Sequence, residues 1–213
     1  SDLGGVFIKL PLSLNVNPLG VSKKVIAKLE NLDPKLIFHY YPENVYLIAK
    51  IAEYAGVNAK EILLGDGCDG CLGMISNTFI EIGDEAVIPI PTFHRYEFHT
   101  LCMGGTPIFV QMRDFRINEN DVLEKVNEKT KLIFLCDPNN PTGLPIDNEI
   151  KEGIIKKFDG IVVIDEALAD VSGKNSLSLI KKYDNLVITR SFSKTFGLAS
   201  LRIGYIVANE EVI

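Results

Sequence analysis

The chain has 213 residues, of which 46% are hydrophobic and 23% charged, and its formal net charge at pH 7 is −6. This composition is that of an ordinary globular protein, and an acidic balance without a long Lys/Arg run argues against a nucleic-acid-binding surface. No apolar run approaches the roughly 20 residues of a membrane span, and the N-terminus lacks a charged-then-apolar signal pattern. Four cysteines favour free thiols in a reducing compartment, so we expect a cytoplasmic protein.

The chain begins with a segment that predicts an arm and then a helix. Pro, Asn and Gly in LPLSLNVNPLG indicate a loop, and SKKVIAKLENL is typical of a first helix. After this helix, apolar runs of strand length alternate with amphipathic stretches. A helix is expected over residues 118–129, with Asn118 as its cap. Seven runs are expected to be strands: 61–65, 85–91, 106–112, 131–136, 160–167, 185–191 and 202–209.

The expected strands are continuous in Val, Ile and Leu rather than alternating with polar residues. Such runs are typical of strands covered on both faces, so we expect an α/β fold with a mainly parallel sheet. Polar segments follow five of the strands, at the edge where open α/β sheets bind ligands. These segments are LGDGCDG, PTFHRY, DPNNPTG, DEA and SFSK.

Lys194 is the candidate nucleophile of this edge. A neutral lysine amine can form a Schiff base with an aldehyde, and the pKa of a lysine falls readily on burial or beside another cation. Arg202 and the hydroxyls of Ser191 and Ser193 suit a phosphate group. The glycine turn of residues 65–70 offers free N–H groups at a helix start, although a tight strand-to-helix turn explains the glycines as well.

Three further residues suit a ring with a protonated nitrogen. Asp165 ends the apolar strand GIVVIDEA, where a carboxylate is costly unless it meets a cation. Asn140 can donate to a ring hydroxyl, and Phe93 can stack on a ring. Taken singly, a buried salt bridge, a turn and a core position explain these residues equally well. Together with the amine and the phosphate cradle they indicate pyridoxal phosphate.

Cys68 and Cys71 form a Cys-x-x-Cys pair, which can hint at a metal or redox site. Cys102 and Cys136 supply no second pair at zinc spacing, and the three histidines are scattered. We therefore expect no metal site and interpret the cysteines as small buried hydrophobic residues.

Four motifs together resemble the fold-type I pyridoxal-phosphate-dependent aminotransferases: PTFHRY, DPNNPTG, VVIDEA and SFSKTFGLASLRIGY. The resemblance runs from about Leu12 to Asn209, and the most similar groups are histidinol-phosphate aminotransferase and threonine-phosphate decarboxylase. It implies an arm and first helix over residues 1–30 and a cofactor-binding large domain over residues 31–213. That domain is expected to be a three-layer α/β/α unit with a seven-stranded sheet, with the family's small C-terminal domain absent from this chain.

The resemblance also implies a role for each matching residue. Lys194 would be the Schiff-base lysine, Asp165 the partner of the pyridine nitrogen and Asn140 the partner of the ring hydroxyl. Phe93 would stack on the ring, where relatives usually have tyrosine. The remaining residues would hold the phosphate, the last of them from the neighbouring subunit of a homodimer: Gly67, Cys68, Asp69, Ser191, Ser193, Arg202 and Tyr41.

The expected activity is transfer of an amino group between an amino acid or amino phosphate, such as histidinol phosphate, and a 2-oxo acid such as 2-oxoglutarate. A threonine-phosphate decarboxylase-like enzyme of cobalamin biosynthesis is one alternative, and a non-catalytic binding module is another. The sequence departs from the family pattern at Leu168, where a Tyr or Phe usually follows DEA, and at Cys68 and Gly70 in the glycine turn.

Overall fold

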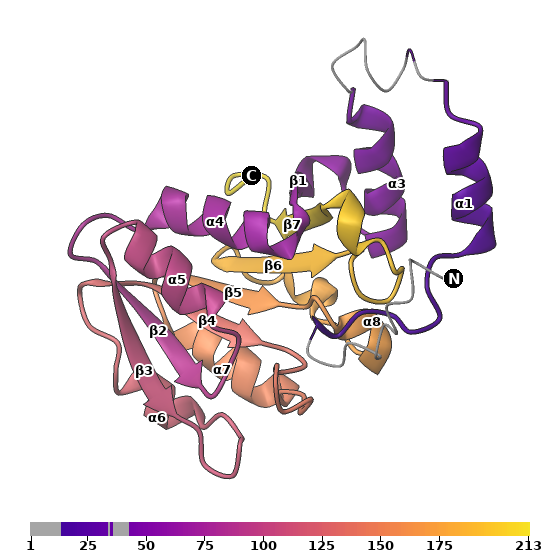
Figure 1. Cartoon of the computed structure of the whole chain (residues 1–213). Coiled ribbons are helices and arrows are strands. Elements are labelled where there is room, and N and C mark those ends of the chain that lie inside the picture. Colours follow the sequence, from indigo (N-terminus) through magenta and orange to yellow (C-terminus); the bar gives the residue numbers. More distant parts are fainter. Residues whose placement is uncertain (1–13, 34, 36–42) are drawn as a thin grey trace.

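The computed structural model describes residues 14–33, 35 and 43–213, which are built around a seven-stranded sheet (Figure 1). The strand order is β1-β7-β6-β5-β4-β2-β3, and β7 alone runs antiparallel to its neighbours. The expectation of a mainly parallel sheet of seven strands is confirmed. The strands are β1 (Ile62–Asp66), β2 (Glu85–Ile90), β3 (Thr106–Gln111), β4 (Thr130–Cys136), β5 (Ile161–Asp165), β6 (Leu186–Ser191) and β7 (Ile203–Ala208).

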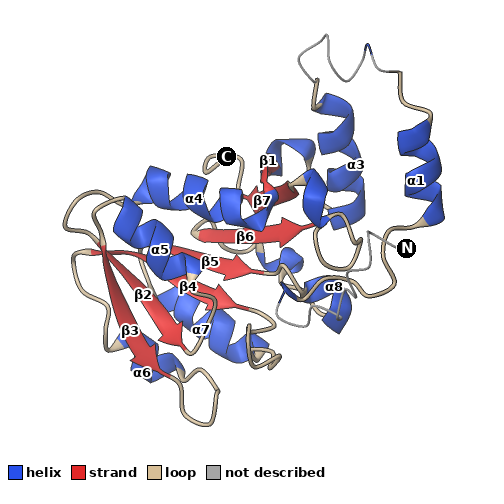
Figure 2. Cartoon of the chain, in the orientation of Figure 1, coloured by secondary structure: helices blue, strands red, loops and turns tan. Residues whose placement is uncertain are grey.

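Helices cover both faces of the sheet, which gives the expected three layers (Figure 2). Helices α4 and α5 pack on one face, and α3, α6 and α7 pack on the other. The helices are α1 (Lys23–Glu30), α3 (Val45–Ala55), α4 (Gly67–Phe79), α5 (Arg95–Cys102), α6 (Glu119–Leu123), α7 (Asn148–Lys157) and α8 (Ala169–Ser172).

Successive residues of the central strands point into two different cores. Along β4, Ile133 and Leu135 face α7, whereas Leu132 and Phe134 face α4 and α5. All four side chains are at most 1% exposed. Because each such side chain contributes about 1.5–3 kcal/mol when it is buried, both cores hold the sheet rigid and fix the positions of its strand ends.

Local capping explains several helix boundaries. Asn118 accepts hydrogen bonds from the N–H groups of Asn120 and Asp121, which confirms it as the cap of α6. The helix itself ends at Leu123, so its expected extent to residue 129 was wrong. Ser22 caps α1 in the same way through the N–H of Lys24. Strand β5 ends at Asp165, two residues earlier than expected, because the N–H of Ala167 bonds the Asp165 side chain instead of continuing the strand.

The cysteines form no disulfide bonds. All four cysteines are free, and Cys68, Cys71 and Cys136 are buried as expected, but Cys102 is exposed. In the part of the chain that the structure describes, no group of three or more His, Cys, Asp or Glu residues could hold a metal ion. No described helix is at once long and apolar enough to cross a lipid bilayer.

Candidate active site

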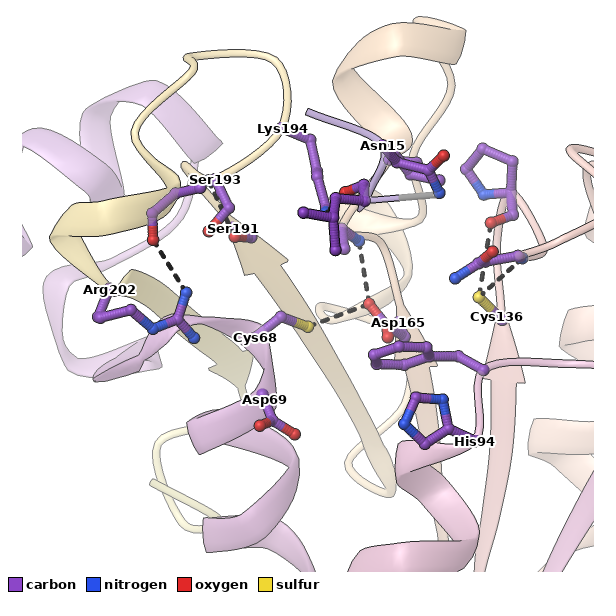
Figure 3. Close-up of a pocket in the computed structure, with 17 residues that line it drawn as sticks. Asn15, Cys68, Asp69, His94, Cys136, Asp165, Ser191, Ser193, Lys194 and Arg202 are labelled. Carbon is purple, nitrogen blue, oxygen red and sulfur yellow. Dashed lines mark hydrogen bonds between the residues drawn. The ribbon is translucent and has the colours of Figure 1, made fainter. Parts of the chain in front are cut away.

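A cavity of about 370 Å³ opens at the carboxyl edge of the parallel strands (Figure 3). Its walls come from the start of α4, the loops after β2, β4, β5 and β6, and the arm at Leu14 and Asn15. Of the residues expected to form the site, Tyr41 lies outside the described residues and Gly67 lies beside Arg202 without lining the cavity. All the others line it: Cys68, Asp69, Phe93, Asn140, Asp165, Ser191, Ser193, Lys194 and Arg202.

Lys194 lies in the loop after β6, with its amine inside the cavity. The Nζ donates a hydrogen bond to the backbone carbonyl of Leu14 at 2.8 Å, and Asn17 Nδ2 bonds the carbonyl of Thr195 at 2.8 Å. The arm is therefore tied across the lysine loop by two bonds. Burial, and then the charge of Arg202, lower the pKa of Lys194 from its ordinary value of 10.5. A lower pKa enlarges the fraction of neutral, nucleophilic amine near neutral pH.

Asp165 is a buried carboxylate at the end of β5, only 3% exposed. Its Oδ1 accepts bonds from Cys68 Sγ (3.1 Å) and from the N–H of Ala167 (3.0 Å), and its Oδ2 accepts a bond from the Tyr96 hydroxyl (2.8 Å). No cationic side chain of the described residues forms a salt bridge with it. Three hydrogen bonds orient this carboxylate, and its charge is left for a cation in the cavity.

Cys68 lies directly beside that carboxylate (Figure 3). Its Sγ bonds Asp165 and lies 3.0 Å from Thr189 Oγ1 on β6. Burial, followed by the charge of Asp165, raises the pKa of the Cys68 thiol well above its ordinary value of 9.0, so the thiol stays protonated and donates. Because the side chain is engaged with Asp165, only the backbone N–H of Cys68 can serve an anion at the start of α4.

Arg202 forms the opposite end of the cavity. Its guanidinium donates to the carbonyl oxygens of Ala199 (3.1 Å) and Asp66 (3.0 Å), and among the described residues no carboxylate pairs with it. The group lies against Gly67, whose φ of +70° only glycine adopts without strain, and a Cβ at Gly67 would collide with the guanidinium. A guanidinium that has no carboxylate partner in the described part of the chain, and that lies beside the N-terminus of a 13-residue helix, is suited to bind an anion.

Two serines complete the anion-binding end. Ser191 Oγ accepts a bond from the N–H of Ser193 at 3.0 Å, which leaves its own proton free to donate. Both residues are buried and line the cavity.

The Asp69 side chain faces helix α5. It accepts hydrogen bonds from Arg95 Nε at 2.6 Å and from Arg95 Nη2 at 2.9 Å, and it lies 2.8 Å from His99 Nε2. Partial burial raises the pKa of Asp69, but the bonds from Arg95 and His99 outweigh that effect and leave it below its ordinary value. The carboxylate therefore stays charged and joins α4 to α5, and only its backbone can face an anion.

The loop after β4 presents Asn140 to the cavity, while its neighbour Asn139 holds the loop. Asn139 Oδ1 accepts the Thr92 hydroxyl at 2.8 Å, and its Nδ2 donates to the Pro91 carbonyl and to Thr142 Oγ1, both at 3.0 Å. The side chain of Asn139 therefore stabilises the loop, whereas Asn140 lines the cavity.

Phe93 is partly buried and lines the cavity, with Tyr96 packed behind it. Its ring meets the Tyr96 ring edge to face at a centroid distance of 5.9 Å. Tyr96 is fully buried, stacks on Phe134 and bonds Asp165, so it supports both the ring wall and the carboxylate. Tyr96 was not among the residues predicted to form the site. Its position three residues after Phe93 at the start of a helix, on the same face, is the signal that could have found it.

The fold and the cavity together define an α/β domain with a lysine amine between a carboxylate and an anion site. The profile of the family "Aminotransferase class I and II" matches residues 8–213. Histidinol-phosphate aminotransferase of Methanocaldococcus jannaschii is 39% identical in an alignment of 212 residues, and the match covers 96% of this chain and 56% of that protein. The chain therefore belongs to the class I and II aminotransferases, and it spans little more than half the length of this relative.

Solved structures agree with this assignment. Histidinol-phosphate aminotransferase from Sinorhizobium meliloti, solved with pyridoxal-5'-phosphate, superposes with a TM-score of 0.83 at 26% identity, over 92% of this chain and 55% of that one. L-Threonine-O-3-phosphate decarboxylase from Porphyromonas gingivalis superposes with a TM-score of 0.76 at 27% identity, over 92% of this chain and 62% of that one. The similarity covers both groups that the motifs resemble.

Proposed function

We propose that the cavity holds pyridoxal phosphate. This proposal rests on two opposite charges that line the same cavity. The buried Asp165 carboxylate lies at one end, and the Arg202 guanidinium lies with the start of α4 at the other. A ligand with a cationic ring nitrogen and a phosphate would satisfy both ends, and Lys194 would supply the amine that reacts with its aldehyde. A volume of about 370 Å³ is in the range of small-ligand pockets.

The residues that would hold the group follow from these positions. Asp165 would keep the ring nitrogen protonated, Asn140 would bond the ring hydroxyl and Phe93 would lie on the ring. Ser191, Ser193, Arg202 and the N–H groups of residues 67–69 would bind the phosphate. Leu168 lines the cavity, and its side chain has no polar atom, so that side chain would offer no hydrogen bond to the ring hydroxyl and would leave that contact to Asn140.

We propose that the whole protein transfers an amino group between a histidinol-phosphate-like amine and a 2-oxo acid such as 2-oxoglutarate. When bound, pyridoxal phosphate supplies an aldehyde for the substrate amine and a ring that takes up electron density from a breaking Cα bond. Lys194 supplies the acid and the base, because its Nζ, with a lowered pKa, can take the proton from the substrate Cα and return it. The arm at Leu14 and Asn15 forms part of the cavity wall and would help to exclude water from the place of this proton transfer.

A product assay on the whole protein tests the activity. With histidinol phosphate and 2-oxoglutarate we expect glutamate to form in proportion to loss of the amine, without carbon dioxide. Release of carbon dioxide from threonine phosphate would assign the protein to the decarboxylase group instead, which the Porphyromonas gingivalis structure keeps as the second candidate. Binding of pyridoxal phosphate without either product would indicate a non-catalytic module.

A separate prediction concerns Gly67, at the phosphate end of the cavity. Gly67→Ala is expected to lower pyridoxal phosphate affinity by at least about tenfold, because the new Cβ displaces the Arg202 guanidinium and weakens a charge-assisted bond. Gly56→Ala is the matched control, since Gly56 has the same φ of +70° with nothing within 4 Å of its Cβ position. Both variants should lose stability by about 1 kcal/mol or more from backbone strain. Equal cofactor affinity in the two variants, measured by equilibrium dialysis, would contradict the role of Arg202.

We further propose a cytoplasmic homodimer in which Tyr41 of one subunit reaches the phosphate in the other. Residues 31–213 would form the cofactor-binding large domain, with residues 1–30 as an arm and first helix. Four free thiols support a reducing compartment. The family resemblance supports the shared site.

A further inference from the structure

A buried lysine stands in the apolar face of α7. Lys151 is 2% exposed and shares the buried face of the helix with Ile154 and Ile155. Its Nζ donates to Asp137 Oδ2 at 2.6 Å and to Ser176 Oγ at 2.9 Å. Lys151 does not line the cavity, so it has no contact with a ligand there. A charged group in a core position is costly, and a hydrophobic residue would pack there at lower cost.

On one side, Lys151 reaches the loop that carries Asn140. Asp137 is the first residue of this loop, and its Oδ1 accepts the N–H of Ile146 at the loop's other end at 3.0 Å. Inside the loop, the N–H of Gly143 bonds the Asn139 carbonyl at 2.7 Å. One carboxylate therefore closes the loop of residues 137–146 with one oxygen and anchors it to α7 with the other.

On the other side, Lys151 reaches the end of β5. The N–H of Ser176 donates to Glu166 Oε1, and Glu166 follows Asp165 directly. The two ends also meet through the backbone, since the N–H of Asp137 bonds the Asp165 carbonyl at 2.9 Å. Ser176 and Glu166 are each 1% exposed, so water does not compete for these bonds.

We propose that Lys151 is a positioning residue that fixes the Asn140 loop relative to Asp165, through the buried chain Asp137–Lys151–Ser176–Glu166. Asn140 and Asp165 would bond two different atoms of one rigid ring, so their separation decides whether both bonds form together. This inference rests on the proposed cofactor roles of Asn140 and Asp165. Lys151 would fix this separation from outside the cavity, without contact to ligand or substrate.

The test uses the whole protein in two variants. Asp137→Asn with Lys151→Met removes both charges together, which avoids leaving one of them buried alone. Ser176→Ala keeps every charge and removes only the Oγ acceptor of Lys151. The control is Lys157→Met, which breaks the 2.7 Å pair with Glu119 on the exposed side of the same helix. Two properties are measured: the dissociation constant of pyridoxal phosphate, and amide hydrogen exchange of the cofactor-free protein.

In the double variant we expect cofactor affinity to fall about tenfold, which corresponds to the loss of one hydrogen bond. We also expect the amides of Gly143 and Leu144 to exchange faster, while those of β4 and β5 keep their protection. Ser176→Ala should shift both properties in the same direction, by about threefold. The control should match the wild type. Unchanged loop exchange and affinity in a folded double variant would overturn the proposal, as would loss of protection spread evenly over the domain. If the wild type bound no pyridoxal phosphate, the proposed function would fail, while the loop exchange would still decide the role of Lys151.

Discussion

Replacing Lys194 with alanine is expected to lower the turnover of the whole enzyme by at least about 10²–10⁴-fold, the range that a positioned acid or base supplies. Among the described residues that line the cavity, Lys194 is the only lysine. The Asp165 carboxylate, already engaged in three hydrogen bonds, is not placed to replace it. Turnover is measured with histidinol phosphate and 2-oxoglutarate at saturating cofactor.

The alanine variant is expected to fold normally, because among the described residues the amine has a single hydrogen-bond partner, the Leu14 carbonyl. Lys174→Ala is the control, since Lys174 is an exposed lysine outside the cavity. It should keep wild-type turnover. A Lys194→Ala enzyme with turnover within tenfold of the wild type would remove the lysine from the proposed chemistry.

The second large effect is expected at Asp165. Asp165→Asn removes the negative charge that would keep the ring nitrogen protonated, while the phosphate end and Lys194 stay unchanged. Losing one charge-assisted hydrogen bond of about 1.5–3 kcal/mol would by itself slow a step by roughly ten- to hundredfold. We expect a larger loss, confined to the step that breaks the Cα bond, and measured as single-turnover rates with protonated and deuterated substrate.

Tyr96→Phe is the matched control for Asp165→Asn. It removes the 2.8 Å bond to the same carboxylate and leaves the charge in place. This variant should slow the same step by no more than about tenfold, as expected for one neutral hydrogen bond. If Asp165→Asn changed cofactor affinity alone and left the Cα step at its normal rate, the aspartate would be an anchor rather than the partner of an electron-accepting ring.

Much of the fold could be predicted because its signals are local. Each strand contains at least two of Val, Ile or Leu, and its ends lie within two residues of the predicted ones. Asn118 and Ser22 act as caps through neighbours two or three residues away. Helix α3 was not expected, although Ile51, Ala52 and Ala55 repeat at helical spacing and are buried. Its sequence mixes Val, Tyr and Ile with Ala, so packing on the sheet rather than propensity stabilises it.

The candidate site could be predicted as a set of residues, but not the direction of every side chain. Strand ends of a parallel sheet meet at one edge, so Asn140, Asp165 and Lys194 were expected together. Contacts between segments far apart in the sequence determine where the side chains of Asp69 and Cys68 point. Asp69 turns to Arg95 on α5, and Cys68 turns to Asp165, 97 residues away. No spacing rule predicts either contact.

The most direct test of the proposed active site is made at the Lys194 amine itself. The whole protein is loaded with pyridoxal phosphate, reduced with borohydride, digested and mapped by mass spectrometry. We expect one phosphopyridoxyl group per chain, on Lys194, and a visible absorption band that disappears on reduction. The lowered pKa of Lys194 favours this site over the exposed lysines near neutral pH. Label spread over several surface lysines, or on one residue other than Lys194, would contradict the proposed active site.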